Sequence, residues 1–130
     1  MKVIVIKGDQ NAGKTSVSRF IFNLLLHNGA KLIAIENKKH KDNHCQRGDF
    51  EAIVKYGILN ITICSEGDAL YVVDSNIKQH YDKDYVIVAS RNFANFDKII
   101  GGYSPIIVEK KKGDSIEFVE CARKVISHIK

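Results

Sequence analysis

A short glycine-containing run between an apolar segment and a helical segment constrains this chain more than any other feature. The run is Gly8-Asp9-Gln10-Asn11-Ala12-Gly13-Lys14-Thr15, with the spacing G-x-x-x-x-G-K-T. Val3-Ile4-Val5-Ile6 precedes it, and a continuous β-branched apolar run is typical of a strand buried on both faces, as in parallel sheets. After Lys14 the apolar residues follow a helical spacing that ends near Asn28-Gly29, and glycine is common at a helix C-terminus. We therefore expect a strand, a glycine loop and a helix in succession.

The two glycines and the helix start favour an anionic ligand. Gly8 and Gly13 allow backbone angles and close approaches that side chains would block, so successive N–H groups can turn inward around a phosphate. The helix directs the positive end of its dipole at the same anion. Lys14 is expected to reach the β- and γ-phosphate oxygens, and the Thr15 hydroxyl to ligate Mg²⁺. Asp9 must point away from the phosphates, because its carboxylate would repel them.

In these residues the chain resembles the P-loop NTPase superfamily, and the specific resemblance covers the first ~35 residues. It implies that ATP or GTP binds with Mg²⁺ on a mostly parallel sheet. It also implies nucleotide contacts from Gly8, Asp9, Gln10, Asn11, Ala12, Gly13, Lys14, Thr15 and Ser16. No D-x-x-G ends a strand and no N-K-x-D follows one. The choice between ATP and GTP therefore stays open.

The resemblance also implies a second acidic group, at the end of a strand beside the P-loop strand, to hold Mg²⁺ or to orient an attacking water. Glu66 and Asp68 follow the apolar run Ile61-Thr62-Ile63-Cys64 and are the first choice for this metal and catalytic role. Glu36, after the run Leu32 to Ile35, is the second choice. Helix capping is an alternative role for Glu66 and Asp68, since acidic residues are common in a first turn.

Arg91 is the candidate for stabilising charge on a transferring phosphoryl group. It follows the apolar run 85–90, so it is expected at the carboxyl end of a strand, where open α/β sheets bind ligands. Arginine there could also stack on a base. An exposed loop arginine is the alternative.

The remaining pattern predicts one α/β domain over residues 1–130, with three layers and helices on both faces of a mostly parallel sheet. The runs 50–56 and 59–64 predict an antiparallel hairpin (about 50–64) through Gly57-Ile58. Leu32 to Ile35 is predicted to be a second buried strand, completing a βαβ unit with the first. The other expected elements are a helix over 67–81, a central strand over 85–89, a strand over 105–109 and a helix from 114–115 onward.

Charge and cysteine content limit the class of protein. The formal net charge is +5, concentrated in a basic loop at 37–48 and in Lys110 to Lys112, and solvated loops are the default interpretation of both. His40, His44 and Cys45 make a poor zinc pattern within the first loop, whose Lys38, Lys39, Lys41 and Arg47 could instead form a lid over phosphates. Three cysteines without C-x-x-C spacing favour a reducing compartment.

No apolar segment follows the first strand run as in a signal peptide, and no apolar stretch approaches the ~18 residues of a membrane span, so a cytoplasmic protein without membrane association is expected. Three functions stay open: a Mg-dependent NTPase that reports to a protein partner, a kinase of a nucleotide or another small anionic acceptor, and a nucleotide-binding module without turnover. Nucleic acid is a weaker candidate partner, because no basic and aromatic motif accompanies the positive charge.

Overall fold

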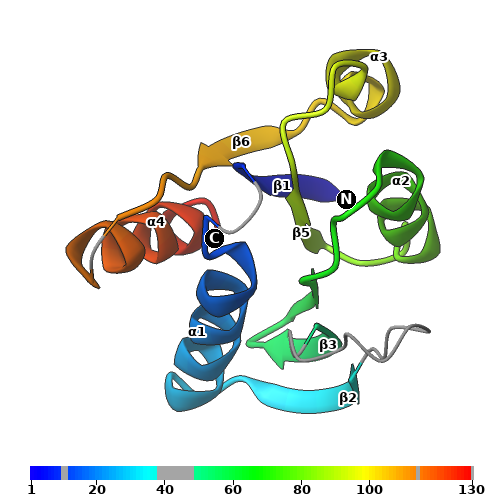
Figure 1. Ribbon diagram of the computed structural model, residues 1–130. Coiled ribbons are helices and arrows are strands. Elements are labelled where there is room, and N and C mark those ends of the chain that lie inside the picture. The colour runs from blue at the N-terminus through cyan, green and yellow to red at the C-terminus, as the bar shows by residue number, and fades with distance from the viewer. Residues whose placement is uncertain (10–11, 38–48, 114, 130) are drawn as a thin grey trace.

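The computed structural model describes residues 1–9, 12–37, 49–113 and 115–129, which form a six-stranded sheet with helices on both faces (Figure 1). The elements, in chain order, are β1 (Lys2–Lys7), α1 (Lys14–His27), β2 (Lys31–Asn37), β3 (Phe50–Tyr56), β4 (Leu59–Cys64), α2 (Leu70–Gln79), β5 (Tyr85–Ser90), α3 (Phe96–Ile100), the 3-10 turn η1 (Gly101–Tyr103), β6 (Ile106–Glu109) and α4 (Ser115–Ser127). None of the helices in these ranges combines the length and the apolar character that crossing a membrane requires.

The strand order β2-β3-β4-β5-β1-β6 makes the sheet mixed. β4, β5, β1 and β6 pair in parallel, whereas β3 is antiparallel to both β2 and β4. The expectation of a mostly parallel sheet is therefore corrected. The predicted hairpin is confirmed, with Tyr56 opposite Leu59 and Gly57 at φ 63° in the two-residue turn. A positive φ in the first loop residue is what a type II′ hairpin turn demands.

β2 lies at an edge of the sheet, not beside β1 as a βαβ unit would place it. The predicted buried strand is thus wrong in its burial, since Leu32, Ile33 and Ile35 are 47%, 58% and 44% exposed. Because β3 already pairs with β4 on one side, β2 pairs with the other side of β3 and becomes the edge strand. An apolar β-branched run indicates a strand but not its place in the sheet.

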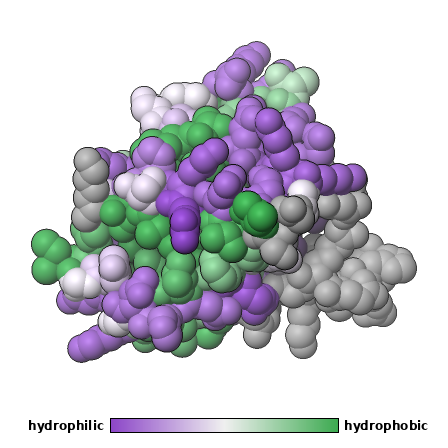
Figure 2. Space-filling model, turned by 90° about the vertical axis from the view of Figure 1, so that its left-hand side faces the viewer, coloured by the Kyte–Doolittle hydropathy of each residue, from purple (hydrophilic) through white to green (hydrophobic). Residues whose placement is uncertain are grey.

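Two apolar layers hold the helices to the sheet. One joins alternate residues of the strands to α1 and α4, and its members include Ile4, Ile6, Val17, Ile21, Leu25, Ala122 and Val125. The opposite layer joins the other strand face to α2 and α3 through Val3, Val5, Val73, Val86, Val88, Phe96 and Ile100. Full burial of such side chains stabilises by about 1.5–3 kcal/mol each. Helices therefore cover both faces of the sheet, as predicted. The outer surface seen from the α4 side carries both hydrophilic and hydrophobic residues (Figure 2).

The ends of α1 follow from its glycines. Gly13, at φ 95°, precedes the first helical residue Lys14. At the other end Gly29 has φ 99°, and the amide of Ala30 donates to the Leu25 carbonyl at 2.9 Å while that of Gly29 donates to the Leu26 carbonyl. This pair of bonds is a Schellman ending, for which a left-handed glycine is preferred. The glycine loop consequently enters α1 directly, as expected.

Candidate functional site

The candidate site lies at the edge of the sheet where the parallel strands end and α1 begins. Lys7, near the end of β1, is in register with Ser90 of β5 and with Glu109 of β6. Cys64 at the end of β4 is in register with Val88 of β5. Because β3 runs the opposite way, it begins at this same edge. Open α/β sheets bind ligands at such carboxyl ends.

The glycine loop fits closely against the neighbouring strand ends. The Gly8 amide donates to the Ser90 carbonyl at 3.0 Å, and the Lys110 amide donates to the Lys7 carbonyl at 2.8 Å. A Cβ on Gly8 would lie 2.3 Å from the Lys110 carbonyl oxygen, which no side chain could tolerate. Gly8 is thus required for the close approach of two backbone segments, as well as for any freedom of the loop.

Lys14 extends across its own loop. Its ammonium donates to the Gly8 carbonyl at 2.9 Å and to the Asp9 carbonyl at 2.6 Å. Burial and the positive charge of Arg91 lower the pKa of Lys14, and Lys110 acts in the same direction, although Asp68 and Asp9 oppose the shift. Because burial is the largest cause, the lowered pKa reflects chiefly the cost of keeping the ammonium away from water.

The neighbouring Asp9 accepts a hydrogen bond from the Asn92 side-chain amide at 2.7 Å. This bond ties the loop after β1 to the segment after β5. The carboxylate of Asp9 is therefore held on a neutral partner beside the glycine loop.

A buried carboxylate contacts the threonine of the motif. Thr15 Oγ1 donates to Asp49 Oδ1 at 3.0 Å, and Ser65 Oγ lies 3.2 Å from the same oxygen. Asp49 is 3% exposed and immediately precedes β3, whose first amide, that of Phe50, donates to Ser65 Oγ at 2.8 Å. Sequence reasoning missed Asp49 because it considered only residues that follow strands. β3 is antiparallel to β4, so the residue before β3 lies at this edge. The predicted antiparallel hairpin could therefore have indicated Asp49.

The other candidate acids lie on the segment between β4 and α2. β5 separates β4 from β1, so Glu66 and Asp68 do not follow the strand beside β1. Asp68 Oδ1 accepts a hydrogen bond from Arg91 at 2.9 Å. The carbonyl of Glu66 accepts one from the Asn76 side chain at 3.1 Å. The structure therefore brings Arg91 and Asp68 together near Lys14, and it ties the Glu66 backbone to α2.

Lys110 is buried beside the loop, which corrects the expectation of a solvated turn at that residue. It is 4% exposed, and its ammonium lies 2.5 Å from Glu117 of α4. A Cβ built on Gly13 would lie 3.7 Å from that ammonium. A pocket of about 270 Å³ adjoins it, lined by Lys7, Gly8, Asp9, Ala12, Asn92, Glu109 and Lys110 to Lys112. The pocket extends the cationic surroundings of the loop toward β6.

The other predicted residues lie beside this cluster, away from it or outside the described part of the chain. Ser16 follows Thr15 on α1 and is exposed. Glu36 lies near the end of β2, an edge strand that three strands separate from β1. The remaining predictions, on Gln10 and Asn11 of the motif and on the basic loop with His40, His44, Cys45, Lys38, Lys39, Lys41 and Arg47, lie outside the described residues.

Comparison of the chain with models of known families, with curated proteins and with solved structures finds no match.

Proposed function

We propose that this chain is a Mg-dependent nucleoside triphosphatase that binds ATP or GTP at the glycine loop. The observation that carries the proposal is the Thr15–Asp49 hydrogen bond of 3.0 Å, which sets a buried carboxylate behind the hydroxyl of the motif. The Lys14 ammonium, which lies across the same loop, supplies the positive charge that the phosphates need. A phosphate-binding loop, a lysine and a hydroxyl with a carboxylate behind it are the parts that a triphosphate site needs.

The charges around the loop support a polyanionic ligand. Burial lowers the Lys14 pKa most, and the nearby positive charges of Arg91 and Lys110 lower it further. The N-terminus of α1 adds its free amides and the positive end of its dipole. A triphosphate would relieve the repulsion among these cations. The Lys14 ammonium would then exchange the carbonyls of Gly8 and Asp9 for phosphate oxygens.

The residues behind the loop fit Mg²⁺. This ion prefers oxygen ligands and is usually held by one or two side chains together with water and phosphate. The Thr15 hydroxyl would bind it, and Asp49 would orient that hydroxyl or a coordinated water. Glu66 and Asp68 remain proposals from the sequence for the same role, but the ion pair of Asp68 with Arg91 favours Asp49. The ion would neutralise charge on the β- and γ-phosphate oxygens.

Arg91 is the proposed stabiliser of the reacting phosphoryl group. Its pairing partner Asp68 is 46% exposed, so the ion pair is easily exchanged for a phosphate oxygen. In the proposed hydrolysis, water attacks the γ-phosphorus and the bond from that phosphorus to the β–γ bridging oxygen breaks. The products are a nucleoside diphosphate and inorganic phosphate.

The test is nucleotide binding and turnover by the purified chain. ATP and GTP, each with Mg²⁺, should raise the melting temperature, because a ligand of the folded state stabilises it. Phosphate release should follow, and Lys14→Ala should remove both effects. Lys31→Ala, an exposed lysine of β2, is the matched control. Absence of any nucleotide effect on the folded wild-type chain would overturn the proposal.

The same assay separates the alternative functions. Labelled nucleotide is incubated with the chain alone and with a panel of nucleosides and nucleoside monophosphates. Label transferred to an acceptor would identify a kinase, and bound nucleotide without either product would identify a binding module. Release of phosphate without an acceptor supports the triphosphatase.

A further inference from the structure

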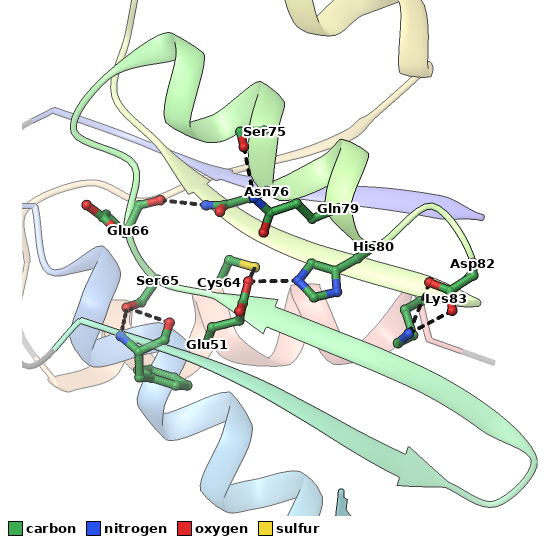
Figure 3. Close-up of polar contacts among 11 residues, drawn as sticks. Glu51, Cys64, Ser65, Glu66, Ser75, Asn76, Gln79, His80, Asp82 and Lys83 are labelled. Carbon is green, nitrogen blue, oxygen red and sulfur yellow. Dashed lines mark hydrogen bonds and ion pairs between the residues drawn. The ribbon is translucent and has the colours of Figure 1, made fainter. Parts of the chain in front are cut away.

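A second polar cluster lies on the face of the sheet that α2 covers. Glu51, Cys64 and His80 direct a carboxylate, a thiol and an imidazole toward one another (Figure 3). His80 Nε2 is 2.7 Å from Glu51 Oε1, and Cys64 Sγ is 3.5 Å from the same oxygen. The three ligand atoms all lie within 4.8 Å of one another. They lie on β3, on β4 and directly after α2, so the fold itself assembles the cluster.

The β3–β4 ladder and α2 fix the position of each member. Glu51 and Cys64 are cross-strand partners in the antiparallel register. His80 directly follows α2, which is held to the same face by the buried Val73 and Ile77. Cys64 packs in that apolar layer too. Because side chains alternate along a strand, this face is opposite to the one where Phe50 is buried against α1.

The donor set is that of a zinc site. Cysteine thiolate, histidine nitrogen and carboxylate oxygen are the ligands that Zn²⁺ uses in proteins, and three of them with one open position make a recurrent arrangement. Exposure is low, at 1% for Cys64 and 7% for His80. The Glu51 side chain is 15% exposed, which leaves a route for an ion from solvent. The three side chains are therefore enclosed by the protein and can still be reached by an ion.

The two distances to the Glu51 oxygen agree with tetrahedral coordination after a small adjustment. Zinc with bonds of about 2.3 Å to sulfur and about 2.0 Å to nitrogen and oxygen separates sulfur from oxygen by about 3.5 Å and nitrogen from oxygen by about 3.3 Å. The observed sulfur to oxygen distance is 3.5 Å. The nitrogen to oxygen distance of 2.7 Å has to lengthen by about 0.6 Å, which a rotation of the Glu51 carboxylate can supply.

We propose that Glu51, Cys64 and His80 form a binding site for a divalent transition-metal ion, with Zn²⁺ as the best match. Water completes the coordination. Binding replaces the thiol proton of Cys64 with the metal, and this proton passes to solvent. His80 binds as the tautomer with its proton on Nδ1, which leaves the Nε2 lone pair for the metal. The ion joins the β3–β4 hairpin to the end of α2. The proposal does not depend on nucleotide binding at the glycine loop.

The experiment is a Co²⁺ titration of the full chain after chelator treatment, without nucleotide. Cobalt held by a thiolate gives a charge-transfer absorption in the near ultraviolet, and we expect this band to saturate at one ion per chain. Zn²⁺ should then displace it. Zn²⁺ should also raise the melting temperature, because it binds the folded state.

Variants identify the ligands. Cys64→Ser should abolish the band, and His80→Gln should weaken Zn²⁺ binding at least about tenfold, as changes even to the outer partners of metal ligands do. The matched control is a double variant, Cys45→Ser with Cys121→Ser, which should keep the band because Cys64 supplies the thiolate. Circular dichroism checks that each variant is folded.

Two results would overturn the site. One is a folded wild-type chain that gives no thiolate–cobalt band and no zinc stabilisation. The other is a band that persists in Cys64→Ser and disappears in the double variant, which would assign the thiolate to another cysteine. If Cys64→Ser does not fold, His80→Gln decides, since unchanged zinc affinity in that folded variant contradicts the proposal.

Discussion

The Thr15 hydroxyl donates a hydrogen bond to the Asp49 carboxylate at 3.0 Å, joining the start of α1 to the start of β3. The two residues are far apart in sequence, and Asp49 is almost fully buried. Ser65, after β4, contacts the same carboxylate oxygen. Three elements of the sheet edge therefore converge on the threonine of the glycine loop.

From this contact we predict that Asp49→Asn lowers the affinity of the nucleotide-bound chain for Mg²⁺. The amide can still accept a hydrogen bond from Thr15, but it removes the negative charge behind the hydroxyl. Loss of such a partner costs about 10–100-fold in metal affinity. A Mg²⁺ titration at fixed nucleotide, followed by phosphate release, measures the effect.

Asp97→Asn is the control for Asp49→Asn, because Asp97 is an exposed carboxylate on α3. It should titrate as the wild-type chain does. An Asp49→Asn chain with wild-type Mg²⁺ affinity would leave Glu66 or Asp68 as the acidic partner of the ion.

The lowered pKa of Lys14 predicts how nucleotide affinity depends on pH. Burial and nearby positive charge lower the pKa of the free site from its ordinary value of 10.5, whereas bound phosphate would raise it. The complex therefore holds the Lys14 proton more tightly than the free chain. Affinity should be highest where free Lys14 is protonated and should fall as pH rises through its lowered pKa.

Lys14→Arg tests this assignment, because a guanidinium stays protonated throughout the range. Binding measured over alkaline pH at constant ionic strength should lose its Lys14-dependent decline in the variant. A decline that is unchanged in Lys14→Arg would assign the titration to another group.

The local patterns predicted most of the elements. The helical spacing after Lys14 and the glycine after Asn28 gave the correct course of α1, and the alternation around Gly57-Ile58 gave both strands of the hairpin. These features depend on contacts between residues close in sequence. Such contacts are encoded in periodicity and in turn chemistry.

What could not be predicted depends on the order of the strands. The run Leu32 to Ile35 has the composition of a buried strand, but its burial is decided by which strand lies next to it. Asp49 becomes a site residue only because β3 is reversed in the sheet. Lys110 is buried where Glu117 of α4 pairs with its ammonium. Each of these is a contact between distant residues, which a single sequence does not reveal.

Gly67 offers a test of how tightly the segment between β4 and α2 is held against β5. A Cβ at Gly67 would lie 2.1 Å from the Ala89 carbonyl oxygen, so the backbone would have to move. We expect Gly67→Ala to destabilise the fold by about 1–3 kcal/mol, as overpacking of a buried position does. Thermal and denaturant unfolding measure the loss.

Gly102→Ala is the matched control for Gly67→Ala. A Cβ there meets no heavy atom within 4 Å, and η1 accepts alanine without a positive φ. Its melting temperature should equal or slightly exceed that of the wild-type chain, because alanine restricts the unfolded state. Equal stability of both variants would show that the segment can move away from β5 at little cost.

The Tyr103 hydroxyl donates to Asp74 at 2.6 Å and so ties η1 to α2. Partial burial and this bond raise the pKa of Tyr103 to about 12 from 10.0, and the same bond lowers the pKa of Asp74 from 3.8. A raised pKa stabilises the fold below pH 10, and that contribution is lost as pH rises through about 12. The Asp74 contribution is present above pH 3.8 and is lost as pH falls through its lowered pKa.

Tyr103→Phe should therefore lose less stability than the wild-type chain as pH rises from 10 to about 12. It should also lose less stability as pH falls through the lowered pKa of Asp74. At neutral pH the loss should be about 1 kcal/mol, since solvent screens a partly exposed bond. Tyr71→Phe is the control, because Tyr71 on α2 is 78% exposed. Denaturant unfolding across this pH range measures all three chains. A Tyr103→Phe profile parallel to the wild-type profile at both ends would mean that the hydrogen bond contributes nothing to the pH dependence.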